Sequence, residues 1–495
     1  MGTAVVSVTA FLLYPYILHH LGDAAYGAWV LIGSVLGYFG LLDLGISAAV
    51  VKMIAEDSSD DAAAANRIVA NGVFLFTILG GLAILLGMLL VPFLNRIFHV
   101  PGFLSRDMQL AYIVVLAAMG VTFPAAIFSA VLAGRQDFGT HNVIIAIHSL
   151  LNAAATVGVL RAGYGIAGMA VASMMVSLLI FAVRAVVIWR RYGIPPFNVR
   201  LLDRSLVRRI FSFSKWLFVL NVAVQIIFQM DNVVIGVLSS VTAISFYQVA
   251  LKPNSFLRSF GTQLTSVVMP AAASLRAANN ESRLQRLLLE STRVSAVVLL
   301  PALIVMVAWG RDFIRMWVGP DYLSSYPTLL VLAAGVFSTL VQGTAGNIIV
   351  TLDMHKRLAA IALVEAAVNL ALSVFLIRRL GILGVALGTT VPTMLVAYGI
   401  SIPYAARLVA VPVWSVYKKI LTPAVLAVLF TAAAVLVNQY VAFSNLFELA
   451  CGAGAVFAAF FAVNVLLDPA ERHIYVGILE RRLDWKIFRS SVANE

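Results

Sequence analysis

Long apolar runs dominate the chain, recur from Thr3 to Leu467, and are separated mostly by short polar connections. Each run has roughly 18 to 25 residues, enough for a helix to cross a hydrocarbon core about 30 Å thick. The runs are continuously apolar and lack an alternation with period two, so the pattern predicts helices and not a transmembrane barrel. We expect about fourteen spans, at residues 3–20, 25–51, 68–94, 108–133, 141–160, 166–189, 213–237, 241–272, 291–311, 326–351, 357–377, 382–407, 418–438 and 444–467.

The composition fits a chain embedded in a bilayer. Of its 495 residues, 62% are hydrophobic and 11% are charged, whereas soluble domains are about half apolar and a quarter charged. The net charge of +12 would suggest a nucleic-acid partner in a soluble protein, but here the basic residues lie mostly between spans and we expect no such partner. Cys451 is the single cysteine, which excludes an intramolecular disulfide and a cysteine-based metal cage. We expect neither a metal nor a cofactor.

The distribution of Lys and Arg predicts the orientation, because basic loop residues are retained in the cytoplasm. Met1–Leu13 carries no Lys or Arg, so the basic region of a secretory signal is missing and residues 3–20 are expected to form the first span. With both termini cytoplasmic, most basic residues lie inside. Those left outside are Arg96, Arg106, Arg161, Arg311, Arg315, Arg378 and Arg379. We therefore expect a multi-pass protein of a bacterial inner membrane.

A basic connection with two consecutive prolines, Pro195 and Pro196, follows the sixth span. It is a candidate hinge between two halves of the protein. Its charges either orient the chain, which we favour, or contact anionic lipid headgroups or a phosphate-bearing substrate. These charges are Arg190, Arg191, Arg200, Arg204, Arg208, Arg209 and Lys215.

Two trios of polar residues share one spacing and predict an internal repeat. Each trio forms a stripe on one face of a helix, since residues four apart lie on the same side. A Gly-Ile-x-Gly sequence follows each trio, at 165–168 and at 381–384. The alternative role of these residues is helix packing, and for Asn152 and Asn369 we give packing and a role in transport equal weight. The trios are His148, Asn152 and Thr156, and Glu365, Asn369 and Ser373.

The repeat predicts an all-α polytopic membrane protein with two parallel six-helix lobes around a central cavity, followed by two further helices. Repeats of this kind occur in transporters that rock one half against the other. The expected divisions are a first lobe at 1–192, a basic cytoplasmic linker at 193–212, a second lobe at 213–410, two additional helices at 411–467 and a cytoplasmic tail at 468–495.

Six ionisable side chains inside the spans are candidates for function. An intramembrane charge costs about 2.5–3.5 kcal/mol even on lenient scales, so each should face a cavity or a partner. They are Asp43, His148, Asp231, Lys252, Arg258 and Glu365. Two polar faces accompany them: Asn221, Gln225, Gln229 and Asn232 in the seventh span, and Tyr247, Asn254, Arg258, Thr262 and Thr265 in the eighth.

Lys252 and Arg258 are expected to attract the phosphate or acidic sugar groups of an anionic substrate, because guanidinium suits phosphate geometry. Pro253 should disturb the helix between them, so their relative phase is open. An internal ion pair with Asp231 is the structural alternative. A weaker hypothesis gives Asp43 and Glu365 a role in binding protons or a cation that couples transport to a gradient.

The chain lacks the motifs of several enzyme classes. It contains no Walker-type phosphate loop, no dinucleotide glycine pattern and no His/Glu metal pair at helical spacing. No connection is long enough to fold as a catalytic domain. The sequence therefore predicts a transporter and not an enzyme.

Several stretches resemble the signatures of bacterial polysaccharide flippases in the multidrug/oligosaccharidyl-lipid/polysaccharide transporter superfamily. The amino-terminal ones are LGDAAYGAW at 21–29, GYFGLLDLG at 37–45 and VKMIAE at 51–56. DNVVIG at 231–236, FYQVA at 246–250 and the two Gly-Ile-x-Gly ends add to the likeness. It extends over nearly the whole chain. One departure is the short amino-terminal arm, which puts in doubt the outward gate that the first helix helps to form.

The resemblance implies a flippase that moves an undecaprenyl-diphosphate-linked oligosaccharide from the cytoplasmic to the periplasmic leaflet by alternating access through a cationic cavity. It also implies a monomer in the bilayer, with polysaccharide assembly machinery as a candidate partner. The alternatives are a peptidoglycan-precursor flippase, a multidrug or cation exporter and, from another class, a membrane-embedded sugar polymerase or ligase.

Overall fold

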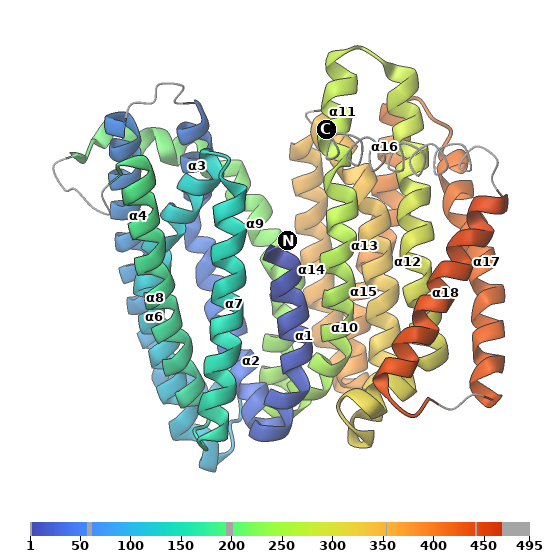
Figure 1. Ribbon diagram of the computed structural model, residues 1–495, viewed down its shortest axis with the longest axis horizontal. Helices are drawn as coiled ribbons and strands as arrows, with labels where there is room; N and C mark the ends of the chain where they lie inside the picture. Colours follow the sequence, from blue (N-terminus) through green and yellow to red (C-terminus); the bar gives the residue numbers. More distant parts are fainter. Residues whose placement is uncertain (1, 57–61, 195–200, 353, 441–442, 468–495) are drawn as a thin grey trace, which may run out of the picture. The chain divides into compact units, whose positions relative to one another are not determined.

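A computed structural model describes residues 2–56, 62–194, 201–352, 354–440 and 443–467. Within these ranges the chain is helical almost throughout and contains no strand (Figure 1). The predicted tail at 468–495 and the middle of the predicted linker, 195–200, lie outside the described residues.

The elements follow one another as long helices with short connections. Up to residue 192 they are α1 (Gly2–Leu21), α2 (Asp23–Phe39), η1 (Gly40–Asp43), α3 (Ile46–Glu56), α4 (Ala62–Leu90), η2 (Val91–Phe93), α5 (Leu94–Ile97), α6 (Gly102–Gly134), α7 (Phe138–Arg161) and α8 (Ile166–Tyr192). The later ones are α9 (Arg204–Leu238), α10 (Val241–Ser266), α11 (Val268–Ala277), α12 (Glu281–Trp317), η4 (Pro320–Ser325), α13 (Tyr326–Thr351), α14 (His355–Leu380), α15 (Ile382–Met394), the π-helix η5 (Leu395–Ser401), α16 (Ile402–Leu408), α17 (Val413–Tyr440) and α18 (Leu446–Leu467).

Twelve helices of the described chain are long and apolar enough to cross a membrane. The remaining two predicted spans coincide with α9 and α10, which are not among the twelve. The expectation of an all-α, polytopic membrane fold is confirmed. The count of fourteen spans stays a prediction.

Two predicted spans are interrupted in the structure. The span expected at 25–51 breaks after η1, where Leu44 and Gly45 have φ angles of 51° and 80° in the left-handed region. Such a conformation ends a helix and is easy only for glycine among ordinary residues. The span expected at 241–272 instead continues through Pro253 and divides only after Ser266. Proline is tolerated inside membrane helices because neighbouring groups satisfy the freed backbone carbonyl.

The chain forms two compact units. The first contains Met1–Phe260, Asp321–Val336 and Leu352–Val396, and the second contains Gly261–Pro320, Phe337–Thr351 and Ala397–Glu495. This division follows spatial contacts, whereas the predicted boundaries at 192 and 213 follow a sequence repeat. The predicted domain limits stay a prediction.

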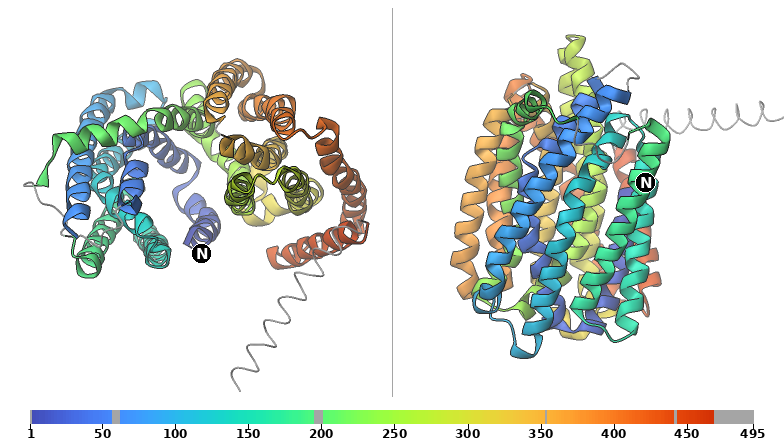
Figure 2. Two further views of the ribbon diagram at one scale, coloured as in Figure 1. Left: turned by 90° about the horizontal axis from the view of Figure 1, so that it is seen from above. Right: turned by 90° about the vertical axis from the view of Figure 1, so that its left-hand side faces the viewer.

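In the first unit, α6 packs against α4 and α8, and α7 packs against α8 and α1. Figures 1 and 2 show α4, α6, α7 and α8 running side by side as long rods. Aromatic rings fill the seams: the centroids of Phe76 and Phe123 lie 5.8 Å apart, and those of Phe128 and Phe181 lie 5.6 Å apart. The same unit contains α14, which packs against α15 and α9.

In the second unit, α12 is the central helix and packs against α17 and α18. Trp309 of α12 meets Phe443 with ring centroids 4.9 Å apart. Lys419 of α17 forms a 3.0 Å ion pair with Glu290 of α12. The two carboxyl-terminal helices are thus fixed to α12 by both apolar and charged contacts.

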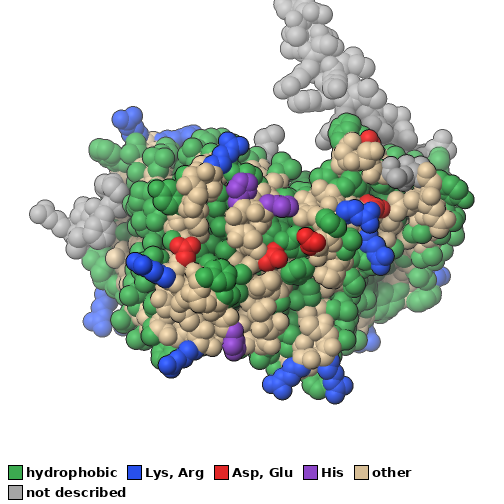
Figure 3. Space-filling view, turned by 90° about the horizontal axis from the view of Figure 1, so that it is seen from below, with side chains coloured by type: hydrophobic (Ala, Val, Ile, Leu, Met, Phe, Trp, Pro, Cys, Tyr) green, Lys and Arg blue, Asp and Glu red, His purple; other side chains and the backbone are tan. Residues whose placement is uncertain are grey.

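Large apolar side chains are exposed along the sides of the helices. Leu85, Leu89, Val428 and Leu429 each expose more than 60% of their surface. Many exposed apolar side chains of this size are unfavourable in water and are expected for a surface that faces lipid. On the face seen in Figure 3, basic side chains occur singly or in small groups and form no continuous patch. The predicted cytoplasmic location of both termini remains a prediction.

Candidate functional site

Asp231 of α9 is a buried carboxylate held by hydroxyl groups from two other helices. Thr389 of α15 donates to both of its oxygens, at 2.9 and 3.0 Å. The Tyr247 hydroxyl of α10 donates to Oδ2, and both residues are at most 5% exposed. Within the described chain no ion pair joins Asp231 to Lys252. The structural partners of Asp231 are therefore hydroxyls, and they tie α9, α10 and α15 together.

The polar face predicted on α9 packs partly against α2. Asn232 donates to Ser34 Oγ at 2.9 Å and accepts from Gln248 Nε2 at 2.8 Å. Gln225 Nε2 donates to the Gly37 carbonyl at 2.6 Å. Gln229 lies beside the same glycine and is partly buried. These amides connect helices, which supports a packing role for this part of the face, and the side chain of Asn221 lies outside the described ones.

On α10, the candidate residues differ in their surroundings. Asn254 is fully buried and its Nδ2 donates to the carbonyls of Ala250 at 2.9 Å and Leu329 at 3.1 Å. Its Oδ1 has no hydrogen-bond partner. Lys252 and Arg258 are both partly buried. No carboxylate oxygen of the described chain lies within 4 Å of Lys252 Nζ.

The predicted stripe on α14 is buried throughout. Glu365 is 8% exposed and accepts a hydrogen bond from Thr393 Oγ1 of α15 at 2.8 Å. Asn369 is 1% exposed, and neither atom of its amide has a partner. Ser373 donates to the Val385 carbonyl at the long distance of 3.5 Å. The stripe faces α15, and its amide leaves hydrogen-bonding capacity unused.

Asp43 lies at the break between η1 and α3. Its Oδ1 accepts from the backbone N–H of Ser47 at 2.9 Å, as expected for a carboxylate beside a helix amino terminus. This contact gives Asp43 a capping role that needs no transported ion. The capping contact is a structural function of Asp43, and its role in ion coupling stays a prediction.

The matching stripe on α7 is less buried than the one on α14. Thr156 is 2% exposed, Asn152 is partly buried, and His148 is partly buried at the edge of a cavity. The two trios share a spacing but occupy different environments. His148 reaches the wall of a cavity.

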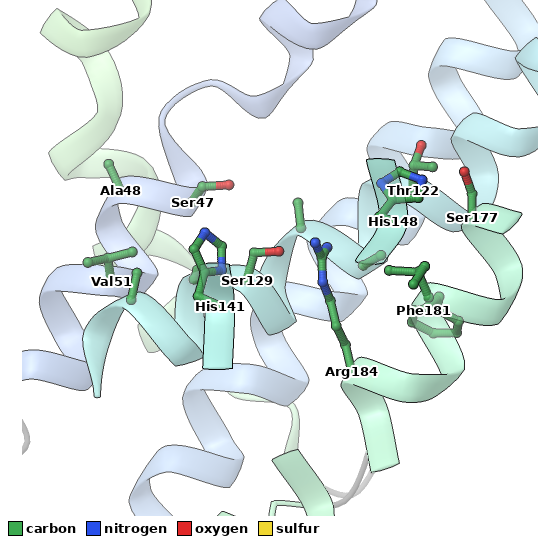
Figure 4. Close-up of a pocket in the computed structure, with 15 residues that line it drawn as sticks. Ser47, Ala48, Val51, Thr122, Ser129, His141, His148, Ser177, Phe181 and Arg184 are labelled. Carbon is green, nitrogen blue, oxygen red and sulfur yellow. The ribbon is translucent and has the colours of Figure 1, made fainter. Parts of the chain in front are cut away.

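The cavity at His148 has a volume of about 540 Å³ and is lined by α3, α6, α7 and α8. Arg184 of α8 and His141 of α7 contribute further nitrogen atoms to its wall. Figure 4 shows Arg184 extending from α8 into the space between Ser129 and His148, with His141 beyond Ser129. The hydroxyl groups in the lining belong to Ser47, Thr122, Ser129 and Ser177.

Arg184 and His141 are ionisable residues of membrane helices that the sequence prediction missed. Both lie within spans that it had delimited, 166–189 and 141–160. The available signal was an arginine six residues before the basic pair Arg190 and Arg191, too deep to belong to that pair. Arg184 also lies seven residues, or two helical turns, after Ser177, so it shares a face with a hydroxyl group.

Comparison with known proteins gives the chain a family. A family model described as "Polysaccharide biosynthesis protein" matches residues 21–327, more than half of the sequence. The chain belongs to this family. The match begins at the LGDAAYGAW sequence and includes both α9 and α10.

Two curated relatives match this chain over most of their own length. A Shigella flexneri protein whose name proposes an O-antigen transporter is 21% identical over 400 residues, 80% of this chain and 93% of that protein. AglR of Haloferax volcanii, whose name proposes a flippase, is 22% identical over 388 residues, 76% of this chain and 75% of that protein. Both names describe transport and neither describes an enzyme.

Solved structures show that the fold is shared with two kinds of transporter. The lipid II flippase MurJ in an inward closed conformation aligns with a TM-score of 0.71 at 14% identity, and covers 94% of this chain and 97% of its own. An inward-facing MATE multidrug transporter aligns with a TM-score of 0.66 at 14% identity, and covers 83% and 95%. At this identity the likeness establishes the fold alone.

Proposed function

We propose that this protein is a flippase that moves an undecaprenyl-diphosphate-linked oligosaccharide from the cytoplasmic to the outer leaflet of the inner membrane. Its family and the names of its relatives support transport of a glycan. The fold it shares with MurJ and MATE proteins supports movement by alternating access. The protein would act as a monomer in the bilayer, with polysaccharide assembly machinery as a candidate partner.

The observation that carries the proposal is the pair of cations on α10. Lys252 and Arg258 lie within a helix whose residues pair with other membrane helices, and Lys252 has no carboxylate within 4 Å in the described chain. A diphosphate offers the compensating charge, and its oxygens match the donors of ammonium and guanidinium groups. A drug exporter for cations would gain nothing from these two residues.

The test is reconstitution of the purified protein in liposomes with a fluorescent lipid-linked glycan. Movement across the bilayer is measured as protection from an external glycosidase. We expect Arg258→Ala and Lys252→Gln to reduce the rate at least about tenfold, and Arg161→Gln, at the exposed end of α7, to leave it unchanged. Normal rates in both cation variants would refute the substrate role of the cations.

Ion coupling is a secondary part of this proposal. Glu365 has a hydroxyl as its hydrogen-bond partner and belongs to a buried stripe with an unsatisfied amide, which supports a site for a proton or cation better than at Asp43. Dissipating proton and sodium gradients should slow transport in the wild-type protein. Transport that is indifferent to both gradients, and to Glu365→Gln, would remove this part of the proposal and leave the substrate unchanged.

Two other outcomes separate the alternatives. A peptidoglycan-precursor flippase would move lipid II in the same assay, and a multidrug exporter would expel a cationic dye in preference to any glycan. A sugar polymerase or ligase would lengthen or transfer the glycan, which mass spectrometry of the recovered lipid detects. Accumulation of an undecaprenyl-linked intermediate in a deletion strain would identify the glycan itself.

A further inference from the structure

The cavity between α3, α6, α7 and α8 contains a cation that the proposed function does not use. Arg184 lies within a membrane-spanning helix, and its Nε is buried without a hydrogen-bond partner. In the described part of the chain no carboxylate lines this cavity, and none lies within 4 Å of the guanidinium. A permanent charge in such a position requires a compensating anion, because desolvation without a partner is unfavourable.

The groups around Arg184 are suited to a ligand that carries several oxygens. His141 and His148 bring imidazole nitrogens to the wall, and His141 Nδ1 is buried and unpartnered. Hydroxyls such as those of Ser129 and Ser177 can donate and accept in the same space. A cation would be repelled by Arg184, and the described residues contain no cluster of metal-ligating side chains.

The size and apolar wall of the cavity favour a ring over a bare ion. Its volume of about 540 Å³ falls in the range of roughly 300–1,000 Å³ that holds organic ligands. Inorganic phosphate would fill only a small part of it and leave most of the hydroxyls unused. Phe181 and Ile180 line the same space and offer an apolar surface to the C–H face of a sugar.

We propose that this cavity binds one acidic sugar unit of the transported glycan, with Arg184 holding its carboxylate or phosphate group. The proposal rests on the glycan-flippase function and adds the substrate class: a glycan that contains an anionic monosaccharide. Serine, threonine and histidine side chains hold the ring hydroxyls. Arg184 is then a specificity residue that lines this cavity. It is separate from Lys252 and Arg258, which do not line it.

The first experiment measures binding to the full-length protein in lipid nanodiscs, with glucuronate, glucose 1-phosphate, glucose and inorganic phosphate as probes. We expect at least one acidic sugar to bind about tenfold or more tightly than glucose and than inorganic phosphate. Comparison of glucuronate with glucose 1-phosphate shows which oxyanion is preferred. Equal binding of glucose and the acidic sugars, or no binding of either acidic sugar, would overturn the proposal.

Variants test whether Arg184 is the anion-binding group. Arg184→Gln should abolish the preference for acidic sugars, Arg184→Lys should retain part of it, and Arg190→Gln, exposed on the same helix, should leave it unchanged. Glucose binding reports whether Arg184→Gln is folded, since its hydroxyl contacts remain. A preference that survives Arg184→Gln would overturn the proposal.

The second experiment separates this inference from the proposed function, with liposomes that contain lipid-linked glycans ending in an acidic or a neutral sugar. Arg184→Gln should slow transport of the acidic glycan at least about tenfold and spare the neutral one. If the wild-type protein binds acidic sugars but moves neither lipid, the flippase function fails and the site stands. If it moves both lipids and Arg184→Gln affects neither, or affects both equally, the function stands and the inference is overturned.

Discussion

Among the glycines of the described chain, Gly27 of α2 has the least room for an added side chain. A Cβ atom at this position would lie 1.8 Å from the carbonyl oxygen of Val241 and 2.7 Å from its carbon. Both are backbone atoms at the start of α10, so no side chain can rotate away. Small residues at such contacts allow membrane helices to approach closely.

We therefore expect Gly27→Ala to destabilise the protein. Overpacking of a fitted contact typically costs about 1–3 kcal/mol, and a clash with backbone belongs at the upper end. The protein is heated in detergent, and the loss of its monodisperse size-exclusion peak gives a transition temperature. We expect this temperature to be lower for Gly27→Ala than for the wild-type protein. Gly33→Ala, on the same helix with no atom within 4 Å of the added carbon, is the matched control. Equal stability of the two variants would contradict the close contact.

Single residues also show what the sequence can and cannot reveal about the site. Asp231 was recognisable as a buried carboxylate from its place in an apolar run, but its partners Tyr247 and Thr389 come from helices whose packing the sequence does not specify. Arg184 was missed although it lies six residues before the basic pair at the end of its helix, because the sequence does not show which groups surround it. Its importance follows from α3, α6 and α7, which surround it with polar groups and no acid.

The beginning of α7 is fixed by a side-chain cap. Asp137 precedes it, accepts from the Thr140 N–H at 3.2 Å and from the Tyr192 hydroxyl at 2.9 Å, and pairs with Arg191 at 2.9 Å. Burial acts to raise the pKa of this carboxyl, but the bonds from Thr140 and Tyr192 and the charge of Arg191 outweigh it and lower the pKa. One carboxylate thus caps α7 and fastens the end of α8.

We expect Asp137→Ala to lower stability by about 0.5–2 kcal/mol, the usual value of an amino-terminal cap. Asp137→Asn retains a capping oxygen but loses the charge, so it should be the milder change. Because the folded pKa lies below the unfolded value of about 3.9, the carboxylate stabilises fully above that pH and the effect disappears as the pH falls through the folded pKa.

Thermal transitions recorded between about pH 7 and pH 3 measure this dependence. The difference between wild type and Asp137→Asn should be largest at neutral pH and should shrink on acidification. A difference that grows as the pH falls would show that Asp137 is not the group responsible. Asp203→Asn, which removes the corresponding carboxylate before α9, offers a second cap for comparison.

The helices themselves were largely predictable, because each long apolar run must satisfy its own backbone in lipid and a helix does so locally. The interruptions were not. Leu44 adopts a left-handed conformation that its residue type does not suggest, and the π-helix η5 follows a continuous apolar run. Conversely, Pro253 predicts a disturbed helix, but α10 continues through it without a break. These deviations depend on neighbouring helices and not on the local sequence.

For the molecule as a whole, the repeat predicts similar helices but not similar chemistry. Glu365 and Asn369 are buried against α15, whereas their counterparts His148 and Asn152 are partly exposed, and His148 reaches a cavity. Equal spacing therefore fixes which face is polar, and the packing around that face decides its use. The two matching positions can therefore hold an acidic group, Glu365, on one helix and a histidine, His148, beside a basic cavity on the other.

The predicted orientation of the entire chain can be tested because it contains a single cysteine, Cys451. In a Cys451→Ala background, Ala162→Cys would label the α7–α8 connection, and Ser205→Cys would label the start of α9. The excess of basic residues places the first outside and the second in the cytoplasm. A membrane-impermeant maleimide should therefore modify Ala162→Cys in spheroplasts with intact inner membranes and should reach Ser205→Cys only after permeabilisation.

A third variant, Ser282→Cys near the start of α12, extends the test to the second half of the chain. The prediction places it in the cytoplasm, so it should behave like Ser205→Cys. Labelling of Ser205→Cys and Ser282→Cys in intact spheroplasts, with protection of Ala162→Cys, would reverse the topology. If only one of Ser205→Cys and Ser282→Cys were labelled in intact spheroplasts, the chain would cross the membrane an odd number of times between them. If α9 and α10 span as a pair, the number of crossings is even and both variants are labelled alike. The same experiment therefore decides the orientation and excludes the case in which only one of these two more polar helices crosses the membrane.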